Sequence, residues 1–227
     1  MSNIDINNVT IHKKNIKNFI LKVTRESEII VSVPRYAKEI DIQIFIQKHQ
    51  NWIDKKLSFY KKYPKIKQKY IDDEKFLFLG KTYKLKLIQS NTNKIKLQQN
   101  KLKLFTPYIE DFDKKEKIVD EWYKQKAEIC FKKLIDKYSK YVNKEINKIR
   151  IKKMKTRWGS CNYVKGYINL NLELIKKPVY GIEYVIFHEL THLIHPNHSK
   201  EFYNYINMFM PDYKNRIKIL EGKVCKN

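Results

Sequence analysis

Apolar and polar residues alternate in short runs near the start of the chain. Two such runs cover residues 19–24 and 28–33, and Pro34 closes the second. Successive side chains of a strand point to opposite faces, so a period of two is typical of strands with one buried face. These runs predict a β-hairpin. Apolar residues then recur at helical spacing from Ile40 to Leu57, which predicts one amphipathic helix.

The alternating pattern returns between residues 76 and 105. Four runs, FLFLG, TYKLKLI, KIKLQ and KLKLF, are separated by polar segments and predict a small antiparallel sheet. Their lysines alternate with Leu and Ile, as expected for a sheet with one buried and one solvated face. The pattern therefore assigns these lysines to the solvated face and gives them no binding role.

The rest of the chain combines longer helical patterns with short strands. A helix is predicted over residues 114–141, followed by a short strand at KIRIKKM and a second strand over residues 167–175. Helical spacing then covers residues 179–192 and resumes near Ser199, and Pro211 separates off a last short helix. Strands and helices in this mixture predict an α+β fold.

The length of 227 residues leaves room for one large domain or two small ones. Strand patterns dominate up to Pro107, and helical patterns dominate after it. We therefore expect a β-rich N-terminal region with one helix over residues 1–110, and a catalytic domain over residues 111–227.

The chain has a formal net charge of +24, from 48 Lys and Arg against 24 Asp and Glu. Clustered basic residues bind polyanions because they release counterions from phosphates. Only five of the 48 are Arg, and Lys, Ile and Asn abound, a skew that also follows from A/T-rich codons. The charge therefore leaves a nucleotide or nucleic-acid partner and simple codon usage as alternatives.

The cysteines and the N-terminus indicate the cellular compartment. Cys130, Cys161 and Cys225 are widely spaced and form no CxxC pair, so the sequence encodes neither a disulfide framework nor a thiolate zinc site. The N-terminus lacks the basic start and apolar run of a signal peptide, and no later segment reaches membrane-spanning length. We expect a cytoplasmic protein with no membrane partner, of undetermined oligomeric state.

Four of the six histidines lie between residues 188 and 198, in the segment VIFHELTHLIHPNHS. Residues four apart on a helix project side by side, so His188 and His192 can bind one ion. Helix-breaking Pro196 allows the chain to turn back, so that His198 supplies a third ligand. Catalytic zinc typically has three protein ligands and one open position, so the pattern predicts a Zn²⁺ site.

Glu189 follows the first of these histidines and completes an HExxH motif. In such a motif the zinc-bound water has a pKa of roughly 7, and the carboxylate removes its proton as the water attacks a carbonyl. An accidental HExxH is the alternative. However, the surrounding helix YVIFHELTHLI is apolar, and burying Glu189 and two histidines there without a metal would be costly. Glu189 is therefore the predicted catalytic residue of a metallohydrolase.

The segment RWGSC lies upstream of this motif. Trp158 and Gly159 fit a packed strand corner, and Cys161 fits a small buried hydrophobic position. A nucleophilic Cys161 would need a base, and the available histidines are assigned to the metal. His195 is predicted to be a rim residue without a ligand role.

The sequence resembles the YgjP-like metallopeptidase domain family, which is related to the WLM and SprT-like zinc peptidases. The resemblance is carried by KTRWGSC (155–161), INLNLELI (168–175), YVIFHELTHLIHPNHSKEF (184–202), MPDY (210–213) and, in the N-terminal half, NWIDKKL, FLFLGKTYKL and EWYKQKA. It implies a zincin-like α+β domain in which His188, His192 and His198 bind zinc. It also implies that Glu189 is catalytic and that the substrate is a peptide or protein.

The resemblance extends to the substrate cleft. In zincin-like folds the strand before the active helix commonly lines the cleft, which implies that residues 167–172 pair with an extended substrate. Candidate substrate-binding or transition-state residues are Arg157, Tyr167, Asn169 and Tyr213. The spacing from His192 to His198 equals that of the metzincins. Since His195 replaces the glycine of their motif, the chain is not assigned to them.

Three functions are consistent with the sequence. The leading one is a zinc-dependent metallopeptidase. The second is a metal-dependent hydrolase of nucleotides or other phosphorylated small molecules, because zinc also polarises phosphoryl oxygens and lysines are abundant. The third is a nucleic-acid-associated protease of SprT-like type, which requires the lysines to gather in a stripe beside the cleft.

Overall fold

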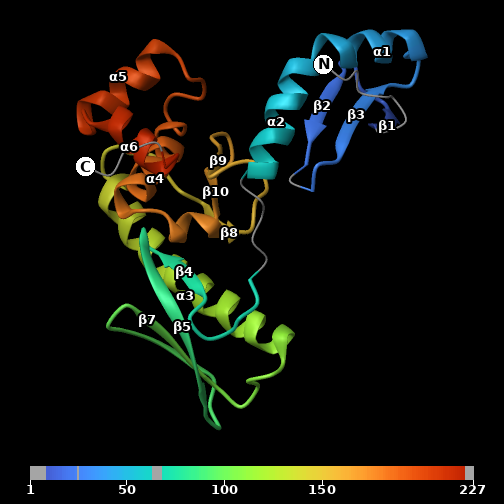
Figure 1. The fold of residues 1–227 in the computed structure, drawn as a ribbon. Helices are drawn as coiled ribbons and strands as arrows, with labels where there is room; N and C mark the ends of the chain where they lie inside the picture. Colours follow the sequence, from blue (N-terminus) through green and yellow to red (C-terminus); the bar gives the residue numbers. More distant parts are fainter. Residues whose placement is uncertain (1–8, 25, 63–67, 223–227) are drawn as a thin grey trace. The chain divides into compact units, whose positions relative to one another are not determined.

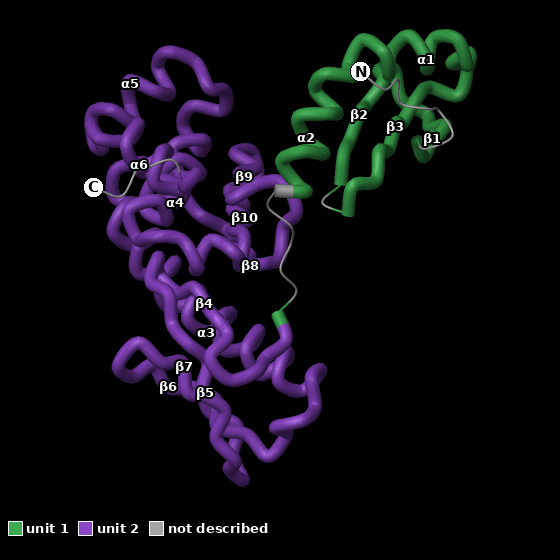
Figure 2. Tube along the Cα trace, in the orientation of Figure 1, with its two compact units in different colours: residues 1–68 green, residues 69–227 purple. Residues whose placement is uncertain are grey.

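The computed structural model describes residues 9–24, 26–62 and 68–222. The chain forms two compact units that divide after Gln68 (Figure 2). Both combine helices with sheets, which confirms the predicted α+β class. The domain boundary expected between residues 110 and 111 lies inside the second unit and stays a prediction. No helix in the described ranges is both long and apolar enough to cross a membrane.

The first unit contains a three-stranded sheet with two helices. Its elements are β1 (Val9–Lys14), β2 (Ile20–Val23), β3 (Ile29–Pro34), α1 (Glu39–Lys48) and α2 (Gln50–Lys62). Strands β2 and β3 pair antiparallel, which confirms the predicted hairpin. Strand β1, which the sequence pattern did not indicate, pairs parallel to β3 and gives the strand order β1-β3-β2. Val31, Val33 and Ile53 are fully buried in the core of this unit.

The single helix predicted from Ile40 to Leu57 is wrong, because α1 and α2 are separate helices. His49 separates them, and its ring Nδ1 lies 2.8 Å from the carbonyl oxygen of Phe45. In a continuous helix that carbonyl would accept the backbone N–H of His49, which instead bonds to Ile46. The apolar spacing continues across the break because both helices bury residues in the same core.

The second unit begins with a four-stranded sheet. Its strands are β4 (Lys75–Phe78), β5 (Lys81–Gln89), β6 (Lys94–Gln98) and β7 (Lys101–Thr106), in the order β4-β5-β7-β6. The sheet was predicted to be antiparallel, but β5 and β7 pair parallel. Strand β7, whose Leu102 and Leu104 are fully buried, lies between β5 and β6, and β6 forms the edge of the sheet. Alternation indicates which face a side chain occupies but carries no information on strand order.

Helix α3 (Phe112–Ser139) covers one face of this sheet (Figure 1). Asp111 caps the helix by accepting the backbone N–H of Lys114. The apolar stripe of α3 includes Val119, Trp122 and Phe131, and it packs into one core with the buried leucines of β5 and β7. This core supports the elements that carry the histidines.

A second sheet of three strands lies between α3 and the histidine motif in the sequence. It consists of β8 (Lys148–Lys152), β9 (Gly159–Asn162) and β10 (Tyr167–Asn171), in the order β8-β10-β9. The strand predicted over residues 167–175 ends at Asn171, and a 3₁₀ helix, η2 (Leu172–Lys176), follows. The Asn171 side chain ends the strand by accepting the backbone N–H of Glu173 and donating to the carbonyls of Met154 and Arg157.

Strand β10 is hydrogen-bonded on both sides, parallel to β8 and antiparallel to β9. The expectation that residues 167–172 pair with a substrate is therefore wrong, since their backbone groups are already used. Strand β9 lies at the edge of this sheet instead.

Three helices complete the second unit: α4 (Val179–Thr191), α5 (Lys200–Phe209) and α6 (Tyr213–Leu220). Their positions confirm the helices predicted around the histidine motif. Helix α4 is buried over most of its length, and Ile182, Phe187 and Leu190 are fully buried. Because α4 packs against α3, α6 and the β8–β10 sheet, the histidines at its C-terminal end stand on a rigid base.

Candidate metal centre

The structure brings the three predicted ligand histidines together. His188 lies in the last turn of α4, His192 caps the helix, and His198 precedes α5. One ring nitrogen from each histidine lies within 4.8 Å of the others. The Nε2 atoms of His188 and His198 are 2.9 Å apart. We refer to these three residues as the histidine group.

The chain between α4 and α5 folds back through a series of tight turns. After α4, the backbone N–H of His195 bonds to the carbonyl of Thr191. Ser199 then caps α5 by accepting the backbone N–H of Phe202. The turn therefore returns His198 toward the helix that carries the other two histidines.

Phe202 forms the apolar base of the histidine group. Its fully buried ring has its centroid 4.7 Å from that of His192 and 4.9 Å from those of His188 and His198. The sequence motifs did not indicate this role, although the position of Phe202 three residues into a capped amphipathic helix is a signal for a buried residue.

Two oxygen atoms orient the imidazole rings. The hydroxyl of Tyr184, one turn before His188, lies 3.3 Å from His188 Nδ1. The backbone carbonyl oxygen of His195 lies 3.2 Å from His192 Nδ1. The carbonyl can only accept, so this contact places the proton of His192 on Nδ1 and leaves its Nε2 available as the ligand atom, whereas the hydroxyl of Tyr184 can donate or accept and holds the His188 ring in orientation. His195 thus acts through its backbone and is not a member of the histidine group.

The electrostatics of the site favour neutral imidazoles on α4. Burial, followed by the proximity of His192 and His198, lowers the pKa of His188 to about 3. Burial also lowers the pKa of His192, although the carbonyl of His195 opposes this shift. Neutral imidazole is the form that binds metal ions.

The donor set fits a zinc ion. Two nitrogens of a tetrahedral zinc site lie roughly 3.3 Å apart, given Zn–N distances of about 2.0–2.1 Å. The 2.9 Å between the Nε2 atoms of His188 and His198 is close to this spacing. Three imidazoles without a thiolate or carboxylate suit a borderline metal such as zinc better than magnesium or calcium.

Glu189 directly follows His188 on α4 and is not one of the three converging residues. Its side chain is buried, which raises its pKa to about 8, and the nearby Arg157 opposes this rise. A carboxyl group in this environment can both accept and release a proton near neutral pH.

Gly159 of β9 makes room for Glu189. A Cβ atom at Gly159 would lie 2.6 Å from both Cγ and Oε1 of Glu189. No side chain fits at this distance, so the glycine of RWGSC lets the edge strand approach the carboxyl group. The sequence indicated only a packed corner at Gly159, because the two residues in contact are 30 positions apart along the chain.

Two of the other candidate residues predicted from the sequence, Arg157 and Tyr213, are connected to the site. Arg157 is exposed and acts on Glu189 through its charge. Tyr213 stacks on Tyr184 at 6.4 Å and on Tyr203 at 6.0 Å, and Tyr203 in turn stacks on His198 at 6.1 Å. A row of aromatic rings therefore connects Tyr213 to the histidine group.

Tyr167 and Asn169 lie on β10 and make other contacts. The guanidinium of Arg150 stands 5.6 Å from the centre of the Tyr167 ring. Asn169 donates to the hydroxyl of Ser160 on β9, while its Oδ1 is buried with no hydrogen-bond partner among the described residues. Asn169 thus faces the edge strand, and the hydrogen bond and the ring contact described for these two residues lead to Ser160 and Arg150 and not to the histidines.

Cys161 is half-buried next to this region. Burial, with a contribution from Glu189, raises the pKa of its thiol to about 12. A thiol that stays protonated at neutral pH is a poor nucleophile, in line with the structural role expected for it. Cys225 lies outside the described residues.

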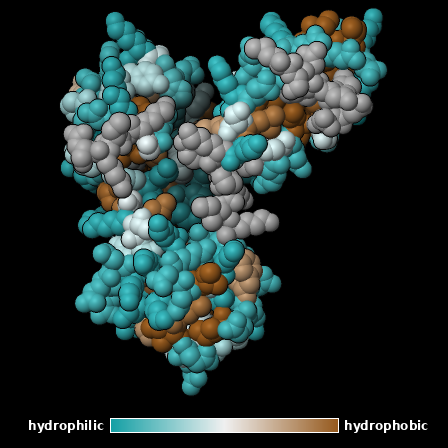
Figure 3. Space-filling model, in the orientation of Figure 1, coloured by the Kyte–Doolittle hydropathy of each residue, from teal (hydrophilic) through white to brown (hydrophobic). Residues whose placement is uncertain are grey.

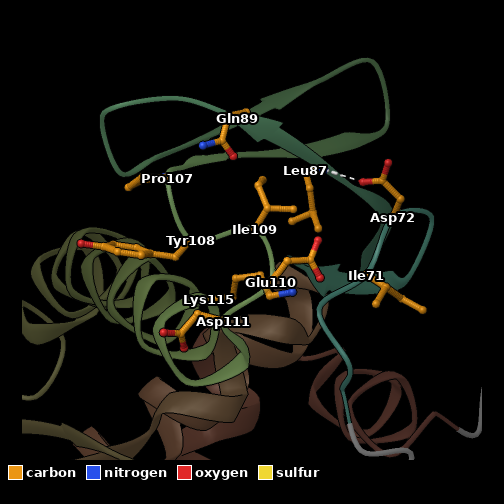
Figure 4. A pocket seen from close by; sticks show the side chains of 10 residues that line it. All are labelled: Ile71, Asp72, Leu87, Gln89, Pro107, Tyr108, Ile109, Glu110, Asp111 and Lys115. Carbon is orange, nitrogen blue, oxygen red and sulfur yellow. Dashed lines mark hydrogen bonds between the residues drawn. The ribbon is translucent and has the colours of Figure 1, made fainter.

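A hollow of about 870 Å³ lies elsewhere in the second unit, and none of its lining residues belongs to the histidine group. Figure 4 shows its walls, formed by β5, the segment 107–111 and the start of α3. Asp72 closes one side by accepting the backbone N–H of Leu87. The chemistry of the histidine group, and not the size of this hollow, locates the candidate metal centre.

An α+β unit with three converging histidines at the end of a buried helix defines a metal-binding domain. A family model described as "YgjP-like, metallopeptidase domain" matches residues 17–223. The chain therefore belongs to the YgjP-like metallopeptidase domain family.

Two solved structures are partly similar to this chain. The metallopeptidase zymogen of Pyrococcus abyssi abylysin is 20% identical, over 39% of this chain and 91% of that chain, with a TM-score of 0.35. The metallopeptidase zymogen of Methanocaldococcus jannaschii jannalysin is 24% identical, over 41% of this chain and 90% of that chain, with a TM-score of 0.36. No curated protein matches the chain. The family assignment rests on the family model.

Proposed function

We propose that this protein is a zinc-dependent metallopeptidase in which His188, His192 and His198 hold the ion and Glu189 is the catalytic base. The observation that carries the proposal is the convergence of three imidazoles, and it is supported by the buried carboxyl group of the residue that directly follows His188 on α4. The family match to a metallopeptidase domain supports a peptide or protein as the substrate. The cytoplasmic location predicted from the sequence belongs to the same proposal.

A bound zinc ion would polarise the scissile carbonyl and lower the pKa of a water molecule to roughly 7. Glu189 then accepts a proton from this water and delivers it to the leaving amine. Burial raises the pKa of Glu189, and this favours the second of these steps, the delivery of a proton to the amine.

Substrate binding is proposed at strand β9. As the edge strand of its sheet, β9 can accept an extended peptide as an additional strand. Gly159 on the same strand abuts Glu189, so a peptide paired there would pass beside the catalytic carboxyl group. Arg157 closely precedes this strand and is the proposed group for stabilising negative charge on the carbonyl oxygen, with Tyr213 as the alternative.

The proposal is tested by the isosteric variant Glu189→Gln. Purified protein supplied with zinc is offered a peptide library and, separately, a panel of nucleoside triphosphates. We expect peptide cleavage with kcat/KM reduced by roughly 10²- to 10⁴-fold in the variant, since a lost general base typically has this effect. Zinc content should stay near one per chain, because the substitution leaves the three histidines in place.

The matched control is Glu128→Gln, which neutralises an exposed carboxylate on α3 and should leave cleavage unchanged. A His188→Ala variant should lose the metal and the activity together. Turnover of nucleotides without peptide cleavage would replace the peptidase with the phosphate-ester hydrolase. Full activity in metal-free protein would refute the site altogether.

A further inference from the structure

The outer face of the β4–β7 sheet, which faces away from α3, carries rows of lysines. We define the lysine face as Lys75, Lys84, Lys86, Lys94, Lys96, Lys101 and Lys103. The strand register aligns six of them in two rows of three. One row is Lys75, Lys84 and Lys101, and the next is Lys86, Lys103 and Lys96. Like charges directly opposite one another destabilise a sheet, so these rows impose a cost that a bound anion would remove.

Codon usage alone does not explain the lysine face. Strands β4–β7 contain eight lysines and no Asp or Glu. Helix α3, of similar length, also contains eight lysines, but interspersed with six acidic residues. A compositional bias would act on both regions alike. Strand propensity does not explain the difference either, because lysine and the acidic residues are all disfavoured in strands.

A hollow of about 560 Å³ opens at one end of the lysine face. Four lysines line it, together with a hydroxyl and two amide side chains. The lining residues are Lys75, Lys81, Thr82, Lys84, Gln99, Asn100 and Lys101. The lining contains no carboxylate. Several ammonium groups together with neutral donors form a site that suits a phosphate group.

Few carboxylates neutralise the lysine face. Asp72 lies 2.5 Å from the ammonium group of Lys86, and the exposed Asp73 lies 3.8 Å from that of Lys84. Lys103 donates to the neutral side chain of Gln98. Within the described parts of the chain, no carboxylate lies within ion-pair distance of Lys94, Lys96, Lys101 or Lys103.

An aromatic ring stands next to the second row of lysines. The register places Phe105 beside Ile88 and Lys94, and the ammonium group of Lys96 lies 5.9 Å from the centre of the Phe105 ring. Proteins that bind single strands without sequence preference combine lysines that follow the backbone with aromatic rings on which bases stack. We propose that the lysine face binds single-stranded nucleic acid, with phosphates at the lysine rows and a base against Phe105.

The lysine face suits a nucleic acid better than an anionic membrane. Membrane-surface binding requires large apolar side chains that protrude and insert among the lipids. Among the described residues of this face, Leu77 is the exposed large apolar side chain, at 47%, whereas Phe105 and Ile88 are half-buried. The surface around this sheet is mostly hydrophilic, with apolar patches between the polar groups (Figure 3).

The lysine face belongs to the same compact unit as the histidine group. Binding there would hold a nucleic acid on the domain that carries the candidate metal centre. The inference does not depend on the proposed peptidase activity, because binding is measurable without turnover.

The test compares two quadruple variants of the full chain with the same change in charge. One is Lys84→Gln, Lys96→Gln, Lys101→Gln and Lys103→Gln on the lysine face. The other is Lys117→Gln, Lys124→Gln, Lys132→Gln and Lys133→Gln, all exposed on α3. Binding of a fluorescent dT oligonucleotide is measured by anisotropy over a range of KCl concentrations.

The lysine-face variant should bind at least tenfold more weakly than the wild type. Its salt dependence should be shallower by about 3 in the slope of log K against log[KCl], since each lost single-strand phosphate contact contributes about 0.7. Its thermal midpoint should equal or exceed that of the wild type, because repulsion between neighbouring lysines is relieved. The α3 variant should keep most of the wild-type affinity.

Equal weakening of both variants would overturn the inference, because it would indicate general attraction to a basic protein. Vesicles with anionic lipid that bind more tightly than the oligonucleotide would also overturn it, in favour of a membrane surface. Inorganic polyphosphate that competes as well as dT oligonucleotides of matched charge would refute the contact between a base and Phe105.

Discussion

The histidine group and the lysine face place ionisable side chains in opposite surroundings. In the histidine group, burial lowers the pKa of His188 and His192, and Tyr184 and the carbonyl of His195 hold these two imidazoles in place. On the lysine face, seven cations stay at the surface, and Lys84 and Lys86 each lie near one carboxylate. A partly buried site with oriented donors defines both the kind of ligand and its position, whereas an exposed charged face defines mainly the ligand's chemical class.

The largest effect is expected for Gly159→Ala. This variant tests whether the Glu189 carboxyl group must be held in its observed position. The added Cβ would lie 2.6 Å from the Glu189 side chain and must displace either the carboxyl group or strand β9. A misplacement of about 1 Å can cost roughly 100-fold in rate, and we expect a loss of that order in kcat/KM. Zinc content should be unchanged, because the three atoms nearest to the added Cβ all belong to Glu189 and none to a histidine. Steady-state kinetics and metal analysis measure the two effects separately.

The control for this prediction is Gly181→Ala on α4. Its Cβ would lie 3.2 Å from Cβ and Cδ1 of Leu220 and 3.3 Å from its Cα, so a shift of α6 by a few tenths of an ångström relieves the contact, and alanine favours the helix. Activity should be retained there. Wild-type activity in the Gly159→Ala variant would show that the close approach to Glu189 is not needed.

The second prediction concerns a region where cations are matched by carboxylates, in contrast to the lysine face. Glu183 on α4 accepts hydrogen bonds from Arg216 at 2.6 Å and from Lys137 at 2.8 Å, and its side chain is 11% exposed. Glu183→Gln should lower the free energy of unfolding by about 2 kcal/mol at pH 7, since charged hydrogen bonds contribute roughly this much. Urea unfolding measures the difference.

The same pair of proteins should respond differently to pH. Burial raises the pKa of Glu183, but hydrogen bonds and charge from Lys137 and Arg216 outweigh burial, so that its pKa lies below the ordinary value of 4.5. A lowered pKa in the folded state stabilises the fold above the unfolded-state pKa, and this contribution is lost as the pH falls. The stability difference between wild type and variant should therefore shrink below about pH 4.5. A constant difference down to about pH 3 would contradict the charge-based explanation.

The smallest effect is expected for Tyr184→Phe, which removes the hydroxyl 3.3 Å from His188 Nδ1. Loss of an oriented partner behind a metal ligand typically weakens metal binding by about tenfold or more. The phenylalanine ring should retain the stacking on Tyr213, so the fold should be unaffected. Competition with a zinc chelator measures the affinity. Tyr203→Phe is the matched control, since Tyr203 contacts His198 through its ring face. Equal zinc affinities of the two variants would contradict the prediction.

The local sequence pattern was sufficient for the parts of the fold that depend on neighbours in the chain. The helix that carries His188 and His192 follows from apolar spacing, and the convergence of these two residues follows from their separation of one turn. The hairpin of β2 and β3 follows in the same way from alternation. The end of β10 was missed because the side chain of Asn171 bonds to backbone groups that lie 14 and 17 residues away.

The sequence by itself therefore determined the ligand set to be tested, the carboxyl group beside it and the solvated position of the sheet lysines. Only the tertiary structure decided how these residues meet. The contact of Gly159 with Glu189, the placement of Phe202 beneath three imidazoles and the strand order that aligns the lysines all depend on packing beyond neighbouring residues. Periodicity records which face of an element is buried, but the partner of that face depends on packing across the whole unit.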